Sequence, residues 1–160
     1  MELHAAHGFF LNEIIEKNNR DDEYGGCFDG RFRFIKDVIS GIKAVCGTKF
    51  IVSVRFGNAH LDELKKEAVA IENSGADLLD VSYGCKAPFG LPKEFPYDNK
   101  IYMASLVKEI SHVPVIAVGG IRSGEQAEQI IKCGYADMVA VGTGHLCDPK
   151  WTKSYYVQKL

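Results

Sequence analysis

The chain has 160 residues, of which 46% are hydrophobic and 25% are charged, and its formal net charge is −2. This composition is typical of one soluble globular domain, and it gives no reason to expect nucleic acid or a membrane surface as a partner. The length excludes a complete eight-stranded barrel, which typically needs roughly 250 residues. No apolar run approaches the roughly 18 residues of a membrane span and no signal peptide is recognisable, so we expect a cytoplasmic location.

The cysteines argue against a metal centre. They are Cys27, Cys46, Cys85, Cys133 and Cys147. Their number is odd and no Cys-x-x-Cys pair occurs, which disfavours a zinc site, an iron–sulfur site and a disulfide framework. We therefore expect free thiols in a reducing compartment.

Apolar periodicity divides the chain into alternating strands and helices. Apolar residues three or four apart indicate helices, and short β-branched runs bounded by turn residues indicate strands. The strands are expected at the start of the chain up to residue 3 and at residues 50–54, 78–81, 114–118 and 138–141. The helices are expected at residues 9–16, 29–46 and 99–110, from Leu61 to Gly75, and from Ser123 to Gly134.

Three local patterns sharpen these assignments. The helix at 29–46 has an apolar stripe, and Asp29 can cap its start and Gly47 its end. The run 50–54 is apolar, as expected of a strand buried on both faces. Residues 123–126 form a capping box that opens a helix. The stripe comprises Phe32, Ile35, Ile39, Ile42 and Val45, and the residues expected to face inward after the capping box are Ala127, Ile130 and Ile131.

An internal repeat supports a fold built from similar units. Residues 74–78 and 133–138 share one pattern, in which a helix ends on Gly and the chain enters the next strand through Asp. Strands that alternate with helices of 10 to 15 residues indicate βα units and a parallel sheet. On pattern alone, half of a (β/α)8 barrel and a small open doubly wound sheet are both compatible with the chain.

Polar residues and glycines gather where the predicted strands end. In parallel barrels the active site collects at the carboxyl ends of the strands. The residues at these ends are His4 and His7, Arg55, Ser82 and Tyr83, Gly119 and Gly120, and Gly142, Thr143 and Gly144. This clustering predicts a functional site at one end of the sheet.

His4 and His7 are three residues apart, so they can share one face of a helical turn and bind a metal or an oxyanion. A pair like this can also be structural. A third Cys, His or carboxylate at a clear spacing is missing, so we expect no metal site. Both neutral and charged imidazoles can donate hydrogen bonds, which favours an acceptor oxygen as the ligand.

The other strand ends offer a charge and a flexible backbone. Arg55 directly follows the run 50–54 and can either extend into solvent or act as a fixed positive charge. Glycine lets a backbone approach a ligand closely, and barrels often bind phosphate with the loops after their last two strands. The candidate phosphate loops contain Gly119, Gly120, Gly142 and Gly144. An ordinary βα turn is the alternative explanation.

The string His4-Ala5-Ala6-His7-Gly8, together with the run Asn18–Gly26, closely resembles the old yellow enzyme family of FMN-dependent ene reductases. In that family the histidine pair ends the fourth strand of a (β/α)8 barrel. The resemblance covers essentially all of residues 1–160, but only about the last half of the family's length. It implies an α/β fold with a partial (β/α)8 TIM barrel of about the last four to five βα units, as a single domain.

The resemblance also implies roles for the candidate residues. His4 and His7 would hold the carbonyl oxygen of an enone-type alkene, and the hydride would pass from NADH or NADPH through FMN to that alkene. Arg55 would lie against the N1/O2 edge of the flavin, where a cation stabilises the anionic reduced form. The FMN phosphate would be bound by Gly119, Gly120, Gly142, Gly144 and His145.

The chain departs from the family pattern in three ways. Phe9 stands where the family usually has a tyrosine that donates a proton. His145 stands where the family usually has an arginine, which should weaken phosphate binding. The first three strands are absent, so each side of the half barrel would expose a strand edge that invites pairing. We therefore expect a complementing half-barrel chain or a homodimer as partner.

Two other functions fit the sequence. Phe9, His145 and the missing strands favour a catalytically inactive half barrel, a binding or assembly module from a truncated reading frame. A phosphate-binding half barrel with isomerase or aldolase chemistry fits the bare pattern, but a strand-end lysine or paired carboxylates are missing.

Overall fold

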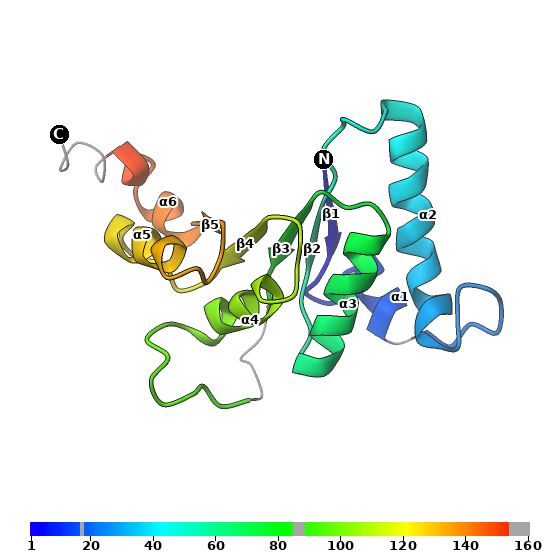
Figure 1. Ribbon diagram of the computed structural model, residues 1–160, viewed down its shortest axis with the longest axis horizontal. Coiled ribbons are helices and arrows are strands. Elements are labelled where there is room, and N and C mark those ends of the chain that lie inside the picture. Colours follow the sequence, from blue (N-terminus) through cyan, green and yellow to red (C-terminus); the bar gives the residue numbers. More distant parts are fainter. Residues whose placement is uncertain (17, 85–88, 154–160) are drawn as a thin grey trace.

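The computed structural model describes residues 1–16, 18–84 and 89–153. Its centre is one parallel five-stranded sheet with the strands in the order β1-β2-β3-β4-β5 (Figure 1). The strands are β1 (Glu2–Ala5), β2 (Ser53–Phe56), β3 (Leu78–Val81), β4 (Val115–Val118) and β5 (Met138–Ala140). The helices are α1 (Phe10–Glu16), α2 (Phe28–Cys46), α3 (Leu61–Asn73), α4 (Asn99–Lys108), α5 (Gly124–Lys132) and α6 (Thr143–Cys147).

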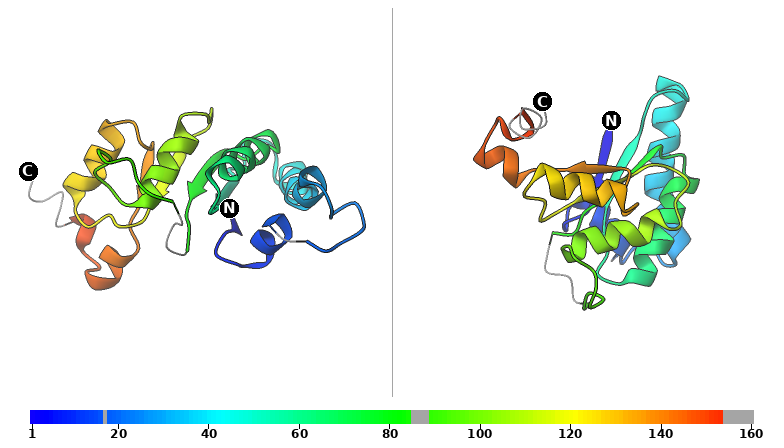
Figure 2. Two further views of the ribbon diagram at one scale, coloured as in Figure 1. Left: turned by 90° about the horizontal axis from the view of Figure 1, so that it is seen from below. Right: turned by 60° about the vertical axis from the view of Figure 1, so that its left-hand side comes forward.

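The strand order decides between the two folds that the sequence pattern allows. A doubly wound sheet reverses its strand order at a switch point, whereas here each strand pairs with the next one along the chain. Right-handed crossovers then place the helices on one side of the sheet, and α2, α3 and α4 lie on one side in Figure 2. The sheet is curved and does not close, which confirms the prediction of a partial barrel.

The two faces of the sheet have different environments. Leu3, Val54, Leu79 and Val115 point toward the helices and are buried. They join one core with helix residues such as Ile35, Leu64, Ile101 and Ile130. The residues one position further on face the open, inner side of the half barrel. They form a register row of His4, Arg55, Asp80, Ile116 and Met138.

The prediction of a strand over 50–54 that is buried on both faces is wrong in position, although residues 52–54 are buried as predicted. β2 begins only at Ser53, because its register with β1 starts with Ser53 opposite Glu2. Phe50 and Ile51 precede the strand and are 38% and 62% exposed. Arg55 therefore lies inside β2 and not after the strand. Its side chain is on the inner face, which the helices do not cover.

The helix predicted over 29–46 is confirmed, with changes at its ends. Asp29 lies in the first turn of α2, and the capping position is Cys27, which makes no side-chain cap. Gly47 follows the helix as predicted. Val45 was expected on the apolar stripe but is 86% exposed, because the last turn of α2 extends beyond the core. Ile131 was likewise expected to face inward and is 43% exposed.

The capping box at the start of α5 is confirmed in part. The Ser123 hydroxyl accepts a hydrogen bond from the Gln126 backbone N–H at 3.2 Å. The Gln126 side chain does not complete the box, because its Oε1 accepts from the Arg122 N–H at 2.9 Å. One of the free N–H groups of the first turn, that of Gln126, is thereby paired with a side chain, and so is the N–H of Arg122, which precedes the N-cap.

The repeated Gly-to-Asp pattern corresponds to a repeated contact at the amino ends of the strands. The Asp77 N–H donates to the Val52 carbonyl and the Val52 N–H donates to Asp77 Oδ2, both at 2.8 Å. The Asp137 N–H donates to the Val115 carbonyl at 2.9 Å, and the Val115 N–H donates to Asp137 Oδ2 at 2.8 Å. Each aspartate thus binds the backbone of the preceding strand in two places.

A lysine from the helix before that strand completes each contact. Lys43 of α2 pairs with Asp77, and Lys108 of α4 pairs with Asp137 at 2.8 Å. Burial raises the pKa of both aspartates, but the hydrogen bonds from the lysine and the backbone outweigh it and lower both pKa values. We call these two arrangements the aspartate clamps.

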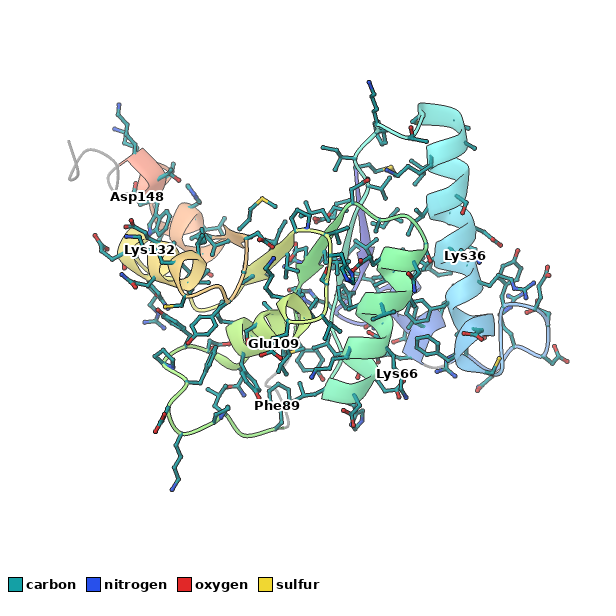
Figure 3. The ribbon with its side chains drawn as sticks, viewed as in Figure 1. Lys36, Lys66, Phe89, Glu109, Lys132 and Asp148 are labelled. Atoms are coloured by element: carbon teal, nitrogen blue, oxygen red, sulfur yellow. The ribbon has the colours of Figure 1, made fainter. Side chains whose placement is uncertain are left out.

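The described surface carries charged residues on the helices and free thiols. Lys36, Lys66 and Lys132 lie on the helices (Figure 3) and are exposed. Four cysteines are free thiols on the surface, namely Cys27, Cys46, Cys133 and Cys147, whereas Cys85 is outside the described residues. In the part of the chain that the structure describes, no helix is both long and apolar enough to cross a membrane.

Candidate functional site

The carboxyl edge of the sheet brings four polar side chains from three strand ends into one network. His4 and Arg55 are neighbours in the β1–β2 register. Arg55 Nη2 donates to the Ser82 hydroxyl at 2.9 Å, and the same oxygen lies 2.9 Å from His7 Nε2. The rings of His4 and His7 are 5.3 Å apart and nearly perpendicular. The structure therefore places the predicted pair beside the predicted arginine, with Ser82 between Arg55 and His7.

His7 is held in a strained backbone conformation. Its φ of 63° lies in the left-handed region, and among the described residues it is the one non-glycine residue with positive φ. The next N–H, that of Gly8, donates to Asn12 Oδ1 at 2.7 Å and fixes this turn. On the other side, a Cβ on Gly84 would be 3.1 Å from the His7 ring. Strain of this kind concentrates at functional sites, where the surroundings enforce it.

The charges around His7 keep its ring neutral near pH 7. Burial, and then the positive charges of Arg55, His4 and Lys100, lower the pKa of His7 below 6.5. The Ser82 oxygen already accepts from Arg55, so its own proton is available for His7 Nε2. This arrangement favours the tautomer that carries its proton on Nδ1, and that N–H can donate to a ligand.

Phe9 occupies the position where the resemblance leads us to expect a tyrosine. Its ring centroid is 5.0 Å from that of His4, and the residue is 60% exposed. The position of Phe9 is therefore close to the histidine pair, but its side chain has no proton to donate.

The sequence analysis missed Asp80. This carboxylate is on β3 in register with Arg55 and is only 5% exposed. Its Oδ2 lies 3.6 Å from Arg55 Nε, an ion pair without a hydrogen bond. Burial raises the pKa of Asp80 to about 6, against the opposing effect of Arg55. The signal in the sequence was a charged residue inside an otherwise apolar strand.

The unpaired polar atoms of the molecule coincide with this row. Among the described residues, three buried side-chain atoms have no hydrogen-bond partner, and these are His4 Nδ1, Arg55 Nε and Asp80 Oδ1. All three residues are adjacent in the register of β1, β2 and β3. Buried polar groups are nearly always paired, so their concentration in one row sets this row apart from the rest of the described residues.

The first predicted phosphate loop, after β4, lies next to Lys100. Gly119 and Gly120 have φ values of 127° and 65°, which side-chain-bearing residues rarely adopt. A Cβ on Gly119 would be 2.5 Å from Lys100 Cδ, and one on Gly120 would be 3.0 Å from Asp98 Cβ. The sequence analysis did not single out Lys100, whose charge is also felt at His7.

The second predicted phosphate loop forms the short helix α6. Gly142 precedes the helix and has open space around it, whereas a Cβ on Gly144 would be 2.8 Å from Val141 and 3.1 Å from Trp151. His145 Nε2 lies 3.0 Å from the Thr152 hydroxyl. The Trp151 indole N–H donates at 3.3 Å to the carbonyl of Arg122 after β4, so the two loops are joined.

A second buried carboxyl lies near the same edge. Glu67 of α3 is 4% exposed, and Asn58, which follows β2, donates to its Oε1 at 2.7 Å. Burial raises the pKa of Glu67 to about 7. A separate groove of about 1060 Å³ lies on the outer side between α2 and α3, and its lining includes Lys36 and Lys66 but none of the predicted site residues.

The chain belongs to the NADH:flavin oxidoreductase / NADH oxidase family, whose family model matches residues 1–158. It is 39% identical to an NADH oxidase of Thermoanaerobacter brockii over 96% of this chain and 25% of that protein. It is 34% identical to an NADPH dehydrogenase of Geobacillus thermodenitrificans over 94% of this chain and 46% of that protein. The chain thus spans a quarter to a half of the length of these curated relatives.

Solved structures confirm the fold. A 2-naphthoyl-CoA reductase in complex with 2-naphthoyl-CoA superposes with a TM-score of 0.82 at 20% identity, over 96% of this chain and 25% of that one. A 6-hydroxypseudooxynicotine amine oxidase of Pseudomonas geniculata N1 superposes with a TM-score of 0.79 at 23% identity, over 98% of this chain and 25% of that one. The resemblance to the old yellow enzyme family and the partial barrel are therefore confirmed.

The family implies FMN as the cofactor, with NADH or NADPH as the reductant. The side chains of the inner face suit such a group, because Arg55 and His4 each hold a nitrogen without a partner and flavin rings carry several hydrogen-bond acceptors. The individual roles of the site residues stay predictions.

Proposed function

We propose that this chain forms the FMN- and substrate-binding half of an oxidoreductase that uses NADH or NADPH to reduce enone-type alkenes. The observation that carries the proposal is the row of His4, Arg55 and Asp80, which holds the unpaired buried polar atoms of the described residues. When bound, FMN supplies the two-electron chemistry that passes a hydride from the nicotinamide to the alkene.

Arg55 contributes a fixed positive charge on the inner face. Asp80 and Ser82 hold its side chain in place. The side chain is still 30% exposed, so part of it remains open to a ligand. A cation at this place favours the binding of a ring that becomes negative on reduction.

His4 and His7 are proposed to hold the carbonyl oxygen of the alkene. Two hydrogen bonds to this oxygen polarise the conjugated C=C bond and orient it. His7 is neutral near pH 7 and can donate through Nδ1, as its contact with Ser82 favours. Phe9 cannot protonate the α-carbon, so water or another acid must provide that proton.

The loops after β4 and β5 are proposed to bind the FMN phosphate, through Gly119, Gly120, Gly142, Gly144 and His145. The contact between Trp151 and the Arg122 carbonyl, which joins these loops, supports the proposal. His145 is a weaker phosphate ligand than the arginine expected from the resemblance. Lys100, whose stem packs against Gly119, adds a positive charge nearby.

A second half barrel, from a partner chain or a second copy, is proposed to cover the inner face. Val118 and Ile116 of β4 and Met138 of β5 are partly or largely exposed there, although equivalent residues of closed barrels fill the interior. Among the described strands, β1 and β5 each have one edge without a neighbour. We take residues 1–160 as one partial barrel domain and place it in the cytoplasm.

The competing function is a binding or assembly module without redox chemistry. Two contacts favour it, because the space beside Gly144 is filled by Val141 and Trp151 and the His145 ring is already bonded to Thr152. Such a module would bind a partner chain, and substitutions at His4, His7 or Arg55 would leave that binding unchanged.

The test is retention of FMN and its use. The purified chain is incubated with FMN, desalted and examined by visible absorbance, alone and mixed with the N-terminal half of the Geobacillus NADPH dehydrogenase. We expect a retained flavin spectrum that Arg55→Ala weakens about tenfold in affinity, or about 1.4 kcal/mol. The control Arg33→Ala removes an exposed arginine of α2 and should change nothing.

His4→Ala and His7→Ala should retain the flavin but lose reduction of cyclohex-2-enone by NADH or NADPH. A colourless protein in both preparations contradicts the proposal and supports the non-redox module. A flavin that binds equally well to the wild type and to Arg55→Ala contradicts the role of Arg55.

A further inference from the structure

Burying the carboxylate of Asp80 at its place on β3 costs free energy of folding. A buried carboxylate needs partners, and here one oxygen has none while the other faces Arg55 Nε at 3.6 Å, beyond hydrogen-bond distance. Val81 and Leu79, its neighbours on β3, are fully buried and apolar. An apolar residue at position 80 would avoid the cost of burying this charge.

The contacts of Arg55 show what Asp80 can influence. Arg55 faces Asp80 with Nε and donates to Ser82 with Nη2, and Ser82 in turn contacts His7. A chain of contacts thus runs from a buried carboxylate on β3, through the guanidinium, to the strained histidine. Asp80 restrains the stem end of the guanidinium, so Nη2 is aimed at Ser82.

We propose that Asp80 is a positioning residue, which shares with Ser82 the hold on Arg55 at the inner face and partly cancels the charge of Arg55 as felt at His7 and at a bound flavin. Its flavin part rests on the proposed function, whereas its effect on His7 does not. Neither the sequence pattern nor the resemblance assigned a role to this residue.

The sign of the effect follows from the charges that face the site. Arg55, His4 and Lys100 all disfavour protonation of His7. Asp80 is the carboxylate beside Arg55 in this row, and the charge of Glu2, which is paired with Ser53 in the register, acts on Asp80. Removing the Asp80 charge leaves Arg55 uncompensated, so the pKa of His7 should fall further. Ser82 still accepts from Arg55 Nη2 in the variant, so the guanidinium stays beside His7. If Asp80 merely supported the fold, its charge would not matter at His7, and the pKa of His7 in folded Asp80→Asn would stay at its wild-type value.

The first measurement needs no flavin. The pKa of His7 is determined by NMR titration of the full chain, in the wild type and in Asp80→Asn, with His7→Gln to assign the resonance. We expect a downward shift in Asp80→Asn.

The control variants separate charge from structure. Asp62→Asn removes an exposed carboxylate of α3 and should leave the His7 curve unchanged. Ser82→Ala removes the contact with His7 but no charge, so it should not reproduce the downward shift expected from Asp80→Asn. An unchanged or higher pKa of His7 in folded Asp80→Asn overturns the proposal. If Asp80→Asn does not fold, Asp80→Glu keeps the charge and must keep the pKa of His7 close to its wild-type value.

The second measurement uses the flavin-loaded chain. With Arg55 uncompensated, Asp80→Asn should favour the reduced over the oxidised flavin about tenfold more than the wild type does, which raises the two-electron midpoint potential by about 30 mV. A lower potential overturns the proposal. If the wild type binds no flavin, the proposed function fails, but the titration of His7 still decides the role of Asp80.

Discussion

The two edges of the sheet contain the same kinds of charged side chain, but these are hydrogen-bonded at one edge and partly unpaired at the other. At the amino edge, the carboxylates of both aspartate clamps receive hydrogen bonds from a backbone N–H and a lysine. At the carboxyl edge, Asp80 has an unpaired oxygen, Arg55 an unpaired nitrogen and His7 a strained backbone. In barrels, the amino edge serves stability and the carboxyl edge serves function. The contrast locates function where polar groups are left unsatisfied.

The largest effect is expected at the amino edge. Asp77→Ala leaves the buried Val52 N–H without its acceptor and Lys43, whose side chain is 16% exposed, without its carboxylate partner, although Lys43 still donates to the Phe50 carbonyl. We expect the free energy of unfolding to fall by about 2–4 kcal/mol, measured by urea denaturation. Asp137→Ala should cost about 1–2 kcal/mol, because the pair with Lys108 is more exposed.

Asp21→Ala, in an exposed loop, is the control for this prediction and should change stability by less than about 0.5 kcal/mol. The His7 titration should not differ between the wild type and a folded Asp137→Ala. Equal losses from the clamp and control variants would show that the clamps do not stabilise the fold.

The next largest effect is a gain in the free energy of unfolding, expected from a substitution of Glu67 near the carboxyl edge. Burial gives Glu67 a folded-state pKa of about 7 against 4.5 for a free glutamate, so the folded chain binds this proton more tightly than the unfolded chain. The contribution of Glu67 to stability therefore falls as the pH rises from about 4.5 to 7, by about 3 kcal/mol in total. Glu67→Gln keeps the acceptor for Asn58 and removes the charge.

We expect Glu67→Gln to raise the free energy of unfolding by about 1–3 kcal/mol at pH 8 and to change it little at pH 5. The measurement is the difference between variant and wild type in urea denaturation at both pH values. Glu125→Gln, on the exposed side of α5, should show no such pH dependence. A gain that is equal at both pH values would mean that the charge of Glu67 is not what destabilises the fold.

The contrast between the edges also explains what the sequence could predict. The clamps were visible as a repeated Gly-to-Asp pattern, because a stabilising contact recurs wherever the fold recurs. The placement of His7 beside Arg55 followed from the rule that parallel strands end at one edge. Asp80 was missed because its partner is on another strand, and only the register of β2 with β3 brings the two together.

Other errors share this cause. The run 50–54 reads as a strand by composition, but pairing with β1 shifts β2 to Ser53–Phe56. The packing of Trp151 against Gly144, seven residues before it, was likewise not foreseen, and the proposed phosphate role of this loop stays a prediction. Both contacts arise where the chain folds back against another segment, which the periodicity of apolar residues cannot reveal.

The smallest expected effect measures the strain at His7 itself. Replacing His7 by Ala or by Gly removes the same ring contacts and the same bond to Ser82. The two variants differ in backbone freedom, and at a φ of 63° Ala is strained whereas Gly is not. We therefore expect His7→Gly to be more stable than His7→Ala by about 1 kcal/mol in urea denaturation.

At an ordinary helical position the order should reverse. Lys36 is exposed on α2, and there Ala should be more stable than Gly by about 1 kcal/mol. Such a reversal would show that the carboxyl edge holds His7 in a conformation that costs stability, as expected if its ring must point at a ligand. If Ala is the more stable residue at both positions, the turn at His7 is relaxed, and the contrast between the edges then rests on the unpaired atoms of Arg55 and Asp80 alone.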